Sequence, residues 1–330
     1  MREGRASLWR LFATIIAALA APFAVSAQEK IVVGYDGYAG FQGPIWAAKD
    51  LGLFERYGLR AELVLIPGSA RGMAALISDS TQFAQGSASA PIPVRLRGGD
   101  VTIIAAALNK FAVSFVAQKE IQKPSDLIGK KIGILNFGGS NDLAVTLALK
   151  EWNIPRQRVT ILATGGAPER LAALAARAID ATVLAPPETV AAARMGLTFL
   201  GSLSDLSASF PNTVITVRRS FLEKNRDIAK RFVRAYSDAI YRFKTDKQSS
   251  LAVYAKRLKQ QDPSIIEETL KYYAPRFSYP PRVDRGGVRT ALDLVGKRNA
   301  DVKGDINVEQ FIDQSLIDEL DREGFFQKLR

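Results

Sequence analysis

The feature that most constrains the fold is a unit of strand, glycine-rich turn, helix and second strand that occurs twice. The first copy begins with the apolar strand 31–35, turns at Gly37–Gly43 and reaches a second strand at 61–66. The second copy begins with the strand 132–135, and its turn covers Asn136–Asn141. Short glycine turns between strands and helices are typical of parallel α/β sheets. We therefore expect two such sheets, each with helices packed around it.

An alignment of the two copies supports the repeat. Shifted by 98 residues, the stretch Gly68–Leu76 falls on Gly166–Leu174, and the two stretches share one glycine, two alanines and one leucine. These identities are weak on their own because the helix is rich in alanine. The strands that follow also end at matching places, at Gly86 and Leu184. The shared order of elements indicates two lobes built in the same way.

After a late strand at 213–217 the chain is almost wholly helical. This return to a strand implies two crossings between the lobes, near Asn109–Ala112 and Phe210–Thr213. We predict a leader at 1–27, lobe one at 28–110 and 214–330, and lobe two at 111–213. The hydrophobic periodicity predicts helices at 44–57, 221–243, 249–258, 264–274, 284–296 and 308–320.

The chain contains no cysteine and no histidine among its 330 residues. Disulfides, thiolate nucleophiles and zinc fingers are therefore excluded, and so is a Ser-His-Asp triad. A catalytic function would have to use carboxylates, hydroxyls, lysines or the backbone. We expect neither a metal nor a cofactor.

The first 27 residues have the pattern of a secretory signal peptide. Three arginines lie within the first ten residues, Leu11–Ala21 is apolar, and Val25–Ala27 is a small-residue cleavage site. The alternative is a membrane anchor, but a spanning helix needs roughly 20 apolar residues. We expect export to the periplasm, cleavage after Ala27 and a mature chain that does not span the membrane.

The formal net charge is +12, from 45 basic and 33 acidic residues, and it becomes +10 when the leader is removed. Basic residues concentrate in the helical C-terminal third, where acidic and apolar residues alternate with them at helical spacing. This pattern favours a solvated helix face. A nucleic-acid site would interleave aromatic residues with a basic stripe. We expect no nucleic-acid partner, and we expect a monomer.

Two motifs resemble those of a known family. Pro44–Leu59, with the sequence PIWAAKDLGLFERYGL, resembles its opening helix, and Gly165–Leu174 with Asp180–Pro187 resembles the hallmark of its second lobe. The family is the nitrate/sulfonate/taurine-type periplasmic substrate-binding proteins of ABC transporters, which includes binders of thiamine pyrimidines. The resemblance covers residues 30–243. One departure is Arg177–Ile179, where the family usually has a glycine before the aspartate.

The resemblance implies a type II periplasmic binding fold, with two Rossmann-like lobes, two hinge crossings and a helical C-terminal region. It also implies a small-molecule ligand between the lobes and an ABC transporter permease as partner. In open parallel sheets, ligands lie beyond the carboxyl ends of the strands. The candidate ligand-binding residues at these positions are Tyr38, Phe41, Ser69, Ser87 and Ser89 in lobe one, and Gly138, Gly139, Ser140, Asn141, Gly166, Pro187 and Glu188 in lobe two.

The segment Gly138–Asn141 gives the strongest signal for a ligand. Its two glycines let backbone N–H groups approach a ligand, and a helix N-terminus favours an anionic group. Alternatively, Ser140 or Asn141 only caps the helix. Asp142, in the same turn, would suit a cationic ligand or stabilise the first turn of the helix.

The other candidates also leave two interpretations open. Ser87 and Ser89 either contact the ligand or cap their own loop. Tyr38 and Phe41 either stack on a planar ligand or pack their loop onto lobe one. Glu188 either faces a cationic or amidine-like ligand, such as an aminopyrimidine, or stabilises the start of a helix.

The leading hypothesis is an exported receptor that captures a small anionic organic ligand, such as a sulfonate or carboxylate, and delivers it to an ABC transporter permease. The alternative ligand is an aminopyrimidine precursor of thiamine. An enzyme on the same fold is less favoured, because the pyrimidine synthases that share it rely on a histidine and a cysteine-rich stretch. Asp142 and Glu188 are the one acidic pair that a hydrolase in this cleft would use. A two-lobed sensor is a third reading.

Overall fold

The computed structural model describes residues 28–258, 260–296 and 306–329. The predicted signal peptide, Met1–Ala27, lies outside the described residues. Within these residues, none of the helices combines the length and the apolar character that a membrane crossing requires.

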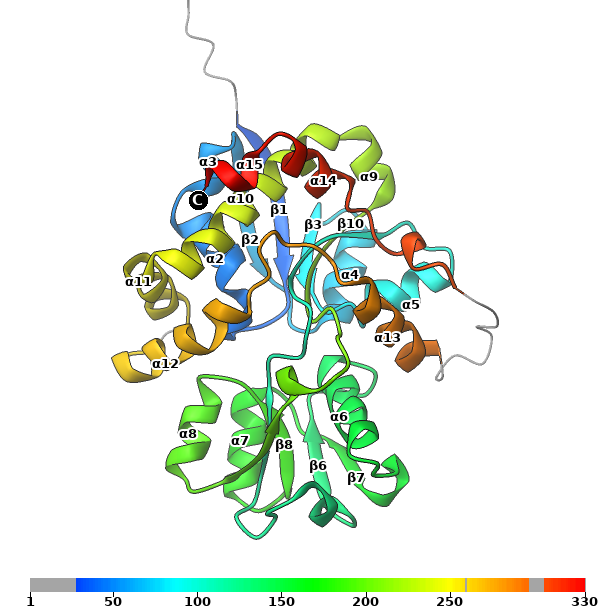
Figure 1. Cartoon of the computed structure of the whole chain (residues 1–330), viewed down its shortest axis with the longest axis vertical. Coiled ribbons are helices and arrows are strands. Elements are labelled where there is room, and N and C mark those ends of the chain that lie inside the picture. The colour runs from blue at the N-terminus through cyan, green and yellow to red at the C-terminus, as the bar shows by residue number, and fades with distance from the viewer. Residues whose placement is uncertain (1–27, 259, 297–305, 330) are drawn as a thin grey trace, which may run out of the picture.

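The chain forms two five-stranded sheets, one in each lobe (Figure 1). The strand order is β2-β1-β3-β10-β4 in the first sheet and β7-β6-β8-β5-β9 in the second. The strands are β1 (Glu29–Tyr35), β2 (Leu59–Leu65), β3 (Phe83–Gly86), β4 (Thr102–Leu108), β5 (Ser114–Ala117), β6 (Lys131–Ile134), β7 (Thr160–Ala163), β8 (Ala181–Leu184), β9 (Thr198–Ser202) and β10 (Thr213–Val217).

The two sheets have the same topology. In each, three parallel strands lie beside one antiparallel strand, which is β10 in the first sheet and β5 in the second. Each antiparallel strand directly follows a crossing between the lobes. The predicted class, a two-lobed α/β binding fold with a helical C-terminal region, is confirmed. The lobe limits 28–110, 214–330 and 111–213 stay a prediction.

Helices cover both faces of the first sheet (Figure 1). On one face, α2, α3 and α10 bury the larger apolar cluster, in which Phe83 of β3 stacks on Phe232 of α10 at 3.9 Å between ring centroids. On the other face, α4 and α5 pack against β3 and β4. The helices are α2 (Gly43–Asp50), α3 (Leu53–Arg56), α4 (Ser69–Ile77), α5 (Pro91–Leu96), α6 (Ser140–Glu151), α7 (Ala167–Ala175), α8 (Glu188–Arg194), α9 (Arg219–Lys224), α10 (Arg226–Thr245), α11 (Lys247–Leu258), α12 (Pro263–Tyr273), α13 (Arg285–Gly296), α14 (Ser315–Arg322) and α15 (Phe325–Lys328).

The two crossings between the lobes are bonded to each other. Phe210 donates its N–H to the carbonyl of Asn109 at 2.8 Å, and Leu203 donates to Val113 at the same distance. The rings of Phe111 and Phe210 stack with their centroids 4.3 Å apart and their planes 17° apart. The two crossings are therefore held together by hydrogen bonds and an aromatic stack rather than forming independent linkers.

The predicted helix at 308–320 is wrong. The chain makes a 3-10 turn at Val308–Gln310 and then an isolated parallel bridge between Ile312 and Ile103 of β4, before α14 begins. Ile103 donates its N–H to the carbonyl of Phe311 at 2.9 Å, and Asp313 donates its N–H to the carbonyl of Ile103 at 2.8 Å. These peptide groups pair with the edge of the sheet and are unavailable to a helix.

Two other predicted helices are interrupted. The helix at 44–57 divides into α2 and α3, because Gly52 adopts the left-handed region with φ of 66°. The helix at 221–243 divides into α9 and α10 at Asn225, which has φ of −127°. The strands β5 and β9 were not expected from the sequence.

Candidate functional site

Two predicted residues of lobe one, Ser69 and Ser87, meet Asp36 where their strands end. Asp36 directly follows β1, and its Oδ2 accepts a hydrogen bond from the hydroxyl of Ser69 at the start of α4. Ser69 in turn accepts the N–H of Ser87, which follows β3, at 3.1 Å. Ser69 and Ser87 were predicted from their positions at strand ends. Asp36 was not, although it lies at the same kind of position.

A buried chain of hydrogen bonds extends from Asp36 into the core. Gln42 donates its Nε2 to Asp36 Oδ1 at 2.9 Å, and Gln85 donates to Gln42 Oε1. Tyr236 of α10 donates its hydroxyl to Gln85 Oε1 at 2.7 Å. Burial raises the pKa of the Asp36 carboxyl, and the hydrogen bonds from Ser69 and Gln42 oppose this shift.

A cavity of about 10 Å³ lies beside this network. Its polar lining residues are Asp36, Ser69, Gln85, Ser87 and Thr216. This volume is near that of one water-sized sphere.

The remaining lobe-one candidates contact their own lobe. The Tyr38 side chain is 52% exposed, and its ring lies 6.3 Å from that of Tyr35 and 6.4 Å from that of Trp46. Phe41 is partly buried against the larger apolar cluster. Ser89 is buried and donates its backbone N–H to the Ser87 hydroxyl at 3.3 Å. These contacts fit the packing and capping interpretations, and the exposed face of Tyr38 leaves ligand stacking open.

In lobe two, the segment Gly138–Asn141 forms the start of α6 after β6. Gly138 has φ of 75°, and its N–H donates to Asp142 Oδ2 at 2.7 Å. Asp142 is buried and also accepts from Arg156 Nη2 at 2.5 Å. Ser140 donates its hydroxyl to Asn212 Oδ1, in the second crossing, at 2.7 Å. Asp142 thus stabilises its own turn, and Ser140 ties the turn to the hinge.

The first N–H groups of a helix have no partner within the helix. Ser140 and Asn141 are the first two residues of α6, so their backbone N–H groups are the donors that this turn offers to a ligand. Gly139 precedes them with extended backbone angles.

The second part of lobe two centres on Arg170, which was not among the predicted residues. Arg170 is 4% exposed and donates to the carbonyls of Gly165, at 2.7 Å, and of Val183, at 3.2 Å. Burial lowers its pKa to about 10, although the charge of Glu188 opposes this. Burial also raises the pKa of Glu188. Arg170 therefore links the Gly165–Gly166 turn to β8. Glu188 begins α8, and Pro187 is the residue before it.

A side chain at Gly166 would displace the carboxylate of Glu169. A Cβ built at Gly166 would lie 2.5 Å from Glu169 Oε2, because the Glu169 side chain folds back over the start of α7. Like α7, the helices α6 and α8 have an acidic side chain in the first turn. Negative groups are favoured at this end of a helix.

The two sets of residues face the same boundary between the lobes. In Figure 1, β1 and β6 point toward each other across the level at which the crossings run. We call these two groups the candidate half-sites: Asp36 with the predicted Ser69 and Ser87 in lobe one, and the starts of α6, α7 and α8 in lobe two.

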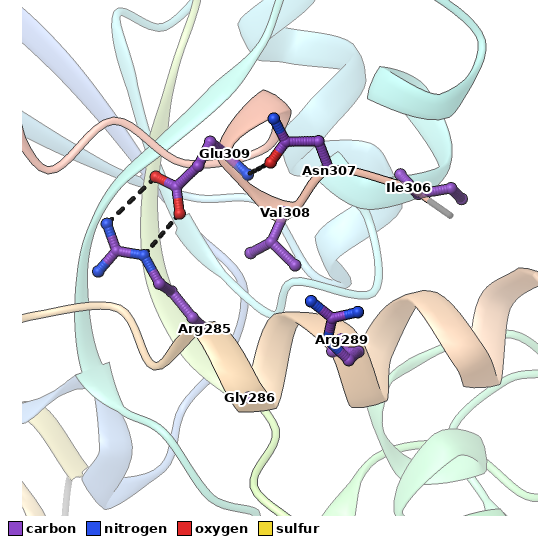
Figure 2. Close-up of a pocket in the computed structure, with 7 residues that line it drawn as sticks. All are labelled: Arg285, Gly286, Arg289, Ile306, Asn307, Val308 and Glu309. Atoms are coloured by element: carbon purple, nitrogen blue, oxygen red, sulfur yellow. Dashed lines mark hydrogen bonds and ion pairs between the residues drawn. The ribbon is translucent and has the colours of Figure 1, made fainter. Parts of the chain in front are cut away.

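A separate pocket of about 470 Å³ lies between the start of α13 and the turn at Val308–Gln310 (Figure 2). Arg285 and Glu309 form an ion pair there, with 2.5 Å between Nε and Oε1. None of the predicted site residues lines it.

Comparison with known proteins identifies the family. The family model described as NMT1/THI5 like matches residues 42–247. The chain belongs to this family. The binding protein YtlA of Bacillus subtilis (strain 168) is 23% identical over 288 residues, which cover 85% of this chain and 86% of YtlA. The family membership confirms the resemblance found in the sequence.

Solved structures confirm the fold. The periplasmic aliphatic sulphonate binding protein SsuA from Escherichia coli gives a TM-score of 0.72 at 20% identity, covering 87% of this chain and 92% of SsuA. The periplasmic nitrate-binding protein NrtA from Synechocystis PCC 6803 gives 0.71 at 14% identity, covering 89% and 88%. DszB, an enzyme solved in complex with biphenyl-2-sulfinic acid, gives 0.62 at 15% identity, covering 89% and 99%. These values show a fold that binding proteins of this class and one enzyme share.

Proposed function

We propose that the mature chain is an exported receptor of an ABC import system that binds a small organic solute between its two lobes. The observation that carries this proposal is the pair of polar half-sites at the carboxyl ends of parallel strands in two sheets of identical topology. A solute that contacts both half-sites shifts the open–closed equilibrium toward the closed form, because only that form lets both lobes bind it.

An anionic organic solute, such as a sulfonate or carboxylate, is the leading ligand class. The backbone N–H groups of Ser140 and Asn141 at the start of α6 support it, because a helix N-terminus stabilises negative charge. The buried guanidinium of Arg170 adds positive charge at the neighbouring turn. The names of SsuA and NrtA, which describe binders of a sulphonate and of nitrate, agree with this class.

An aminopyrimidine is the second ligand class, and the acidic groups favour it. Asp36 and Glu188 are carboxyls whose pKa values are raised by burial, one in each half-site. The amino group would donate to an ionised carboxylate, and a ring nitrogen would accept from a protonated one, so the carboxyl gains a partner in either protonation state.

A catalytic function is the weaker candidate. The acidic pair that a hydrolase would need includes Asp142, and this carboxylate is engaged by Arg156 and by the Gly138 N–H. The chain contains no histidine and no cysteine. The likeness to DszB concerns the fold, and a fold alone does not determine chemistry.

The permease, the periplasmic location, the monomeric state and cleavage after Ala27 belong to the same proposal. A closed receptor presents a surface made of both lobes, and a permease that docks on both lobes distinguishes it from the open form. A sensor protein would recognise the same closed state. We favour transport because a ligand-binding component of an ABC-type import system shares this fold.

A thermal-shift screen of the mature protein tests the proposal. The panel is ethanesulfonate, benzoate, nitrate and 4-aminopyrimidine, each at 1 mM and 10 mM. A ligand present at 100 times its Kd stabilises the folded state by about 2.7 kcal/mol. An anion alone should raise the Tm under the first ligand class, and 4-aminopyrimidine under the second.

Two variants locate the binding site within the screen. Asn141→Pro removes one N–H donor at the start of α6, and Asp36→Asn changes the acidic group of lobe one. The matched control is Glu309→Gln in the separate pocket of Figure 2, which should bind as the parent does. If no compound raises the Tm of the parent, the receptor proposal loses its support. If Glu309→Gln abolishes the shift and both half-site variants keep it, the site is in the wrong place.

A further inference from the structure

The start of α12, in the helical C-terminal region, is joined to the end of α8 of the second lobe by an ion pair. Arg194 of α8 donates both Nη1 and Nη2 to Asp262 Oδ2 at 3.1 Å, and Asp262 caps α12. Burial raises the pKa of the Tyr273 hydroxyl at the end of α12. The negative charge of Glu188, at the start of α8, raises this pKa further. Figure 1 shows α12 beside the boundary with the lobe that contains α8.

The Tyr273 side chain also touches the lobe-one loop that follows β1. A Cβ built at Gly40 would collide with the ring carbons of Tyr273, so the ring lies directly on this glycine. Tyr254 fixes the same loop by donating its hydroxyl to the Gly40 carbonyl at 2.5 Å. Tyr273 therefore packs directly against the lobe-one loop that carries Tyr38.

The Tyr273 ring is held by apolar contacts and its hydroxyl is not. The ring is fully buried, stacks on Phe277 at 6.1 Å and meets Tyr272 edge-on at 5.0 Å. Its hydroxyl is buried and has no hydrogen-bond partner among the residues that the structure describes. A buried polar atom without a partner destabilises the fold, so such an atom calls for an explanation. Phenylalanine would fill the same space without this penalty.

We propose that Tyr273 is a ligand-contacting residue, whose hydroxyl donates a hydrogen bond to an acceptor atom on the solute held between the lobes. This inference rests on the receptor function proposed above, and it adds the C-terminal helical region as a third wall of the site. The chemical class that fits is a solute with an oxygen or nitrogen acceptor at this end: a sulfonate, a carboxylate or a ring nitrogen.

The test compares three variants of the mature protein, each stripped of bound solute by unfolding, dialysis and refolding. Tyr273→Phe removes the unpaired hydroxyl and keeps the ring. Tyr254→Phe removes a hydroxyl that has a partner in the same cluster. Ser237→Ala removes another buried hydroxyl without a partner, in α10 and outside both half-sites. The first readout is the Tm without solute, and the second is binding of the four compounds of the screen, together with native mass spectrometry of protein purified without stripping.

The proposal predicts that Tyr273→Phe and Ser237→Ala melt at or above the Tm of the parent, while Tyr254→Phe melts below it. It also predicts that Tyr273→Phe alone loses about tenfold in solute affinity, which corresponds to about 1.4 kcal/mol, with a matching loss of the mass-shifted species. Ser237→Ala should bind as the parent does.

Two results would overturn the inference while the receptor function stands. One is a fall in the Tm of solute-free Tyr273→Phe similar to that of Tyr254→Phe, because the hydroxyl would then have a structural partner. The other is unchanged solute affinity in Tyr273→Phe. A parent protein that binds none of the compounds and carries no mass-shifted species rejects the receptor function and this inference together. In that case the Tm comparison still reports whether the hydroxyl is unpaired.

Discussion

Replacing Asp36 by asparagine should stabilise the protein at neutral pH. Burial raises the pKa of the Asp36 carboxyl above its ordinary value, and the hydrogen bonds from Ser69 and Gln42 only oppose this effect. A raised pKa means that the folded chain binds the proton more tightly than the unfolded chain does. The resulting stabilisation is complete below the unfolded pKa and is lost as the pH rises through the folded pKa. Asparagine does not titrate, so its advantage should grow over that range.

The size of the effect follows from the contacts around residue 36. An asparagine Oδ1 can accept from Gln42, and its Nδ2 can donate to Ser69, whose hydroxyl oxygen already accepts the Ser87 N–H at 3.1 Å. Because both contacts are kept, the electrostatic difference dominates. At a pH well above the folded pKa, the gain in unfolding free energy is about 1.4 kcal/mol for each unit by which the pKa is raised. Below pH 4 the gain should vanish.

Urea unfolding of the parent and of Asp36→Asn between pH 4 and pH 8 measures this difference. The control is Asp246→Asn, which should have the opposite sign. Asp246 accepts the Ser249 N–H at 3.0 Å, and hydrogen bonds from Ser249 lower its pKa. Its stabilisation is present above the unfolded pKa and is lost as the pH falls. An Asp36→Asn protein that is less stable than the parent at pH 7 and equal to it at pH 4 would refute the reasoning, because that result requires a lowered pKa.

Three further outcomes are expected. Arg194→Glu should favour the open form by at most about 1 kcal/mol, because it breaks an exposed ion pair between Arg194 and Asp262. Small-angle scattering would then show a larger radius of gyration. Adding Asp262→Arg should reverse this increase, and no reversal would argue against the contact. Asp142→Ala should lower the urea unfolding free energy by about 2 kcal/mol, because it removes the buried carboxylate that accepts from the Gly138 N–H and the Arg156 guanidinium; an unchanged midpoint would contradict that role. Gly166→Ala should lower the Tm slightly, since its Cβ meets Glu169 Oε2, and Glu169→Ala should relieve the loss.

The repeated unit made the fold predictable, because each copy combines an apolar strand with a glycine turn. The strand ends also led to Ser69 and Ser87, which the structure brings into contact, and to the start of α6. The strands β5 and β9 were missed because they are short and lie at the hinge, where pairing with other strands defines them. The expected helix at 308–320 failed for the same reason, since its first half pairs with β4.

The residues missed in the site depend on contacts between distant parts of the chain. Asp36 gains its role from Ser69 and Gln42, and Arg170 gains its role from the carbonyls of Gly165 and Val183. One signal for Arg170 was present, because it lies four residues after Gly166 on the first turn of a helix. No local pattern marks Tyr273, whose position follows from the packing of α12 across the lobe boundary.

Native mass spectrometry of the mature protein, purified without denaturation from its native host, tests the central claim most directly. The account predicts one small organic molecule per chain, which is released on unfolding and carries an anionic group or an amino-heterocycle. Asn141→Pro should reduce the bound fraction, and Glu309→Gln should not. A parent protein that carries no such molecule, and whose Tm none of the panel compounds raises, would contradict the claim that this chain binds a solute between its lobes.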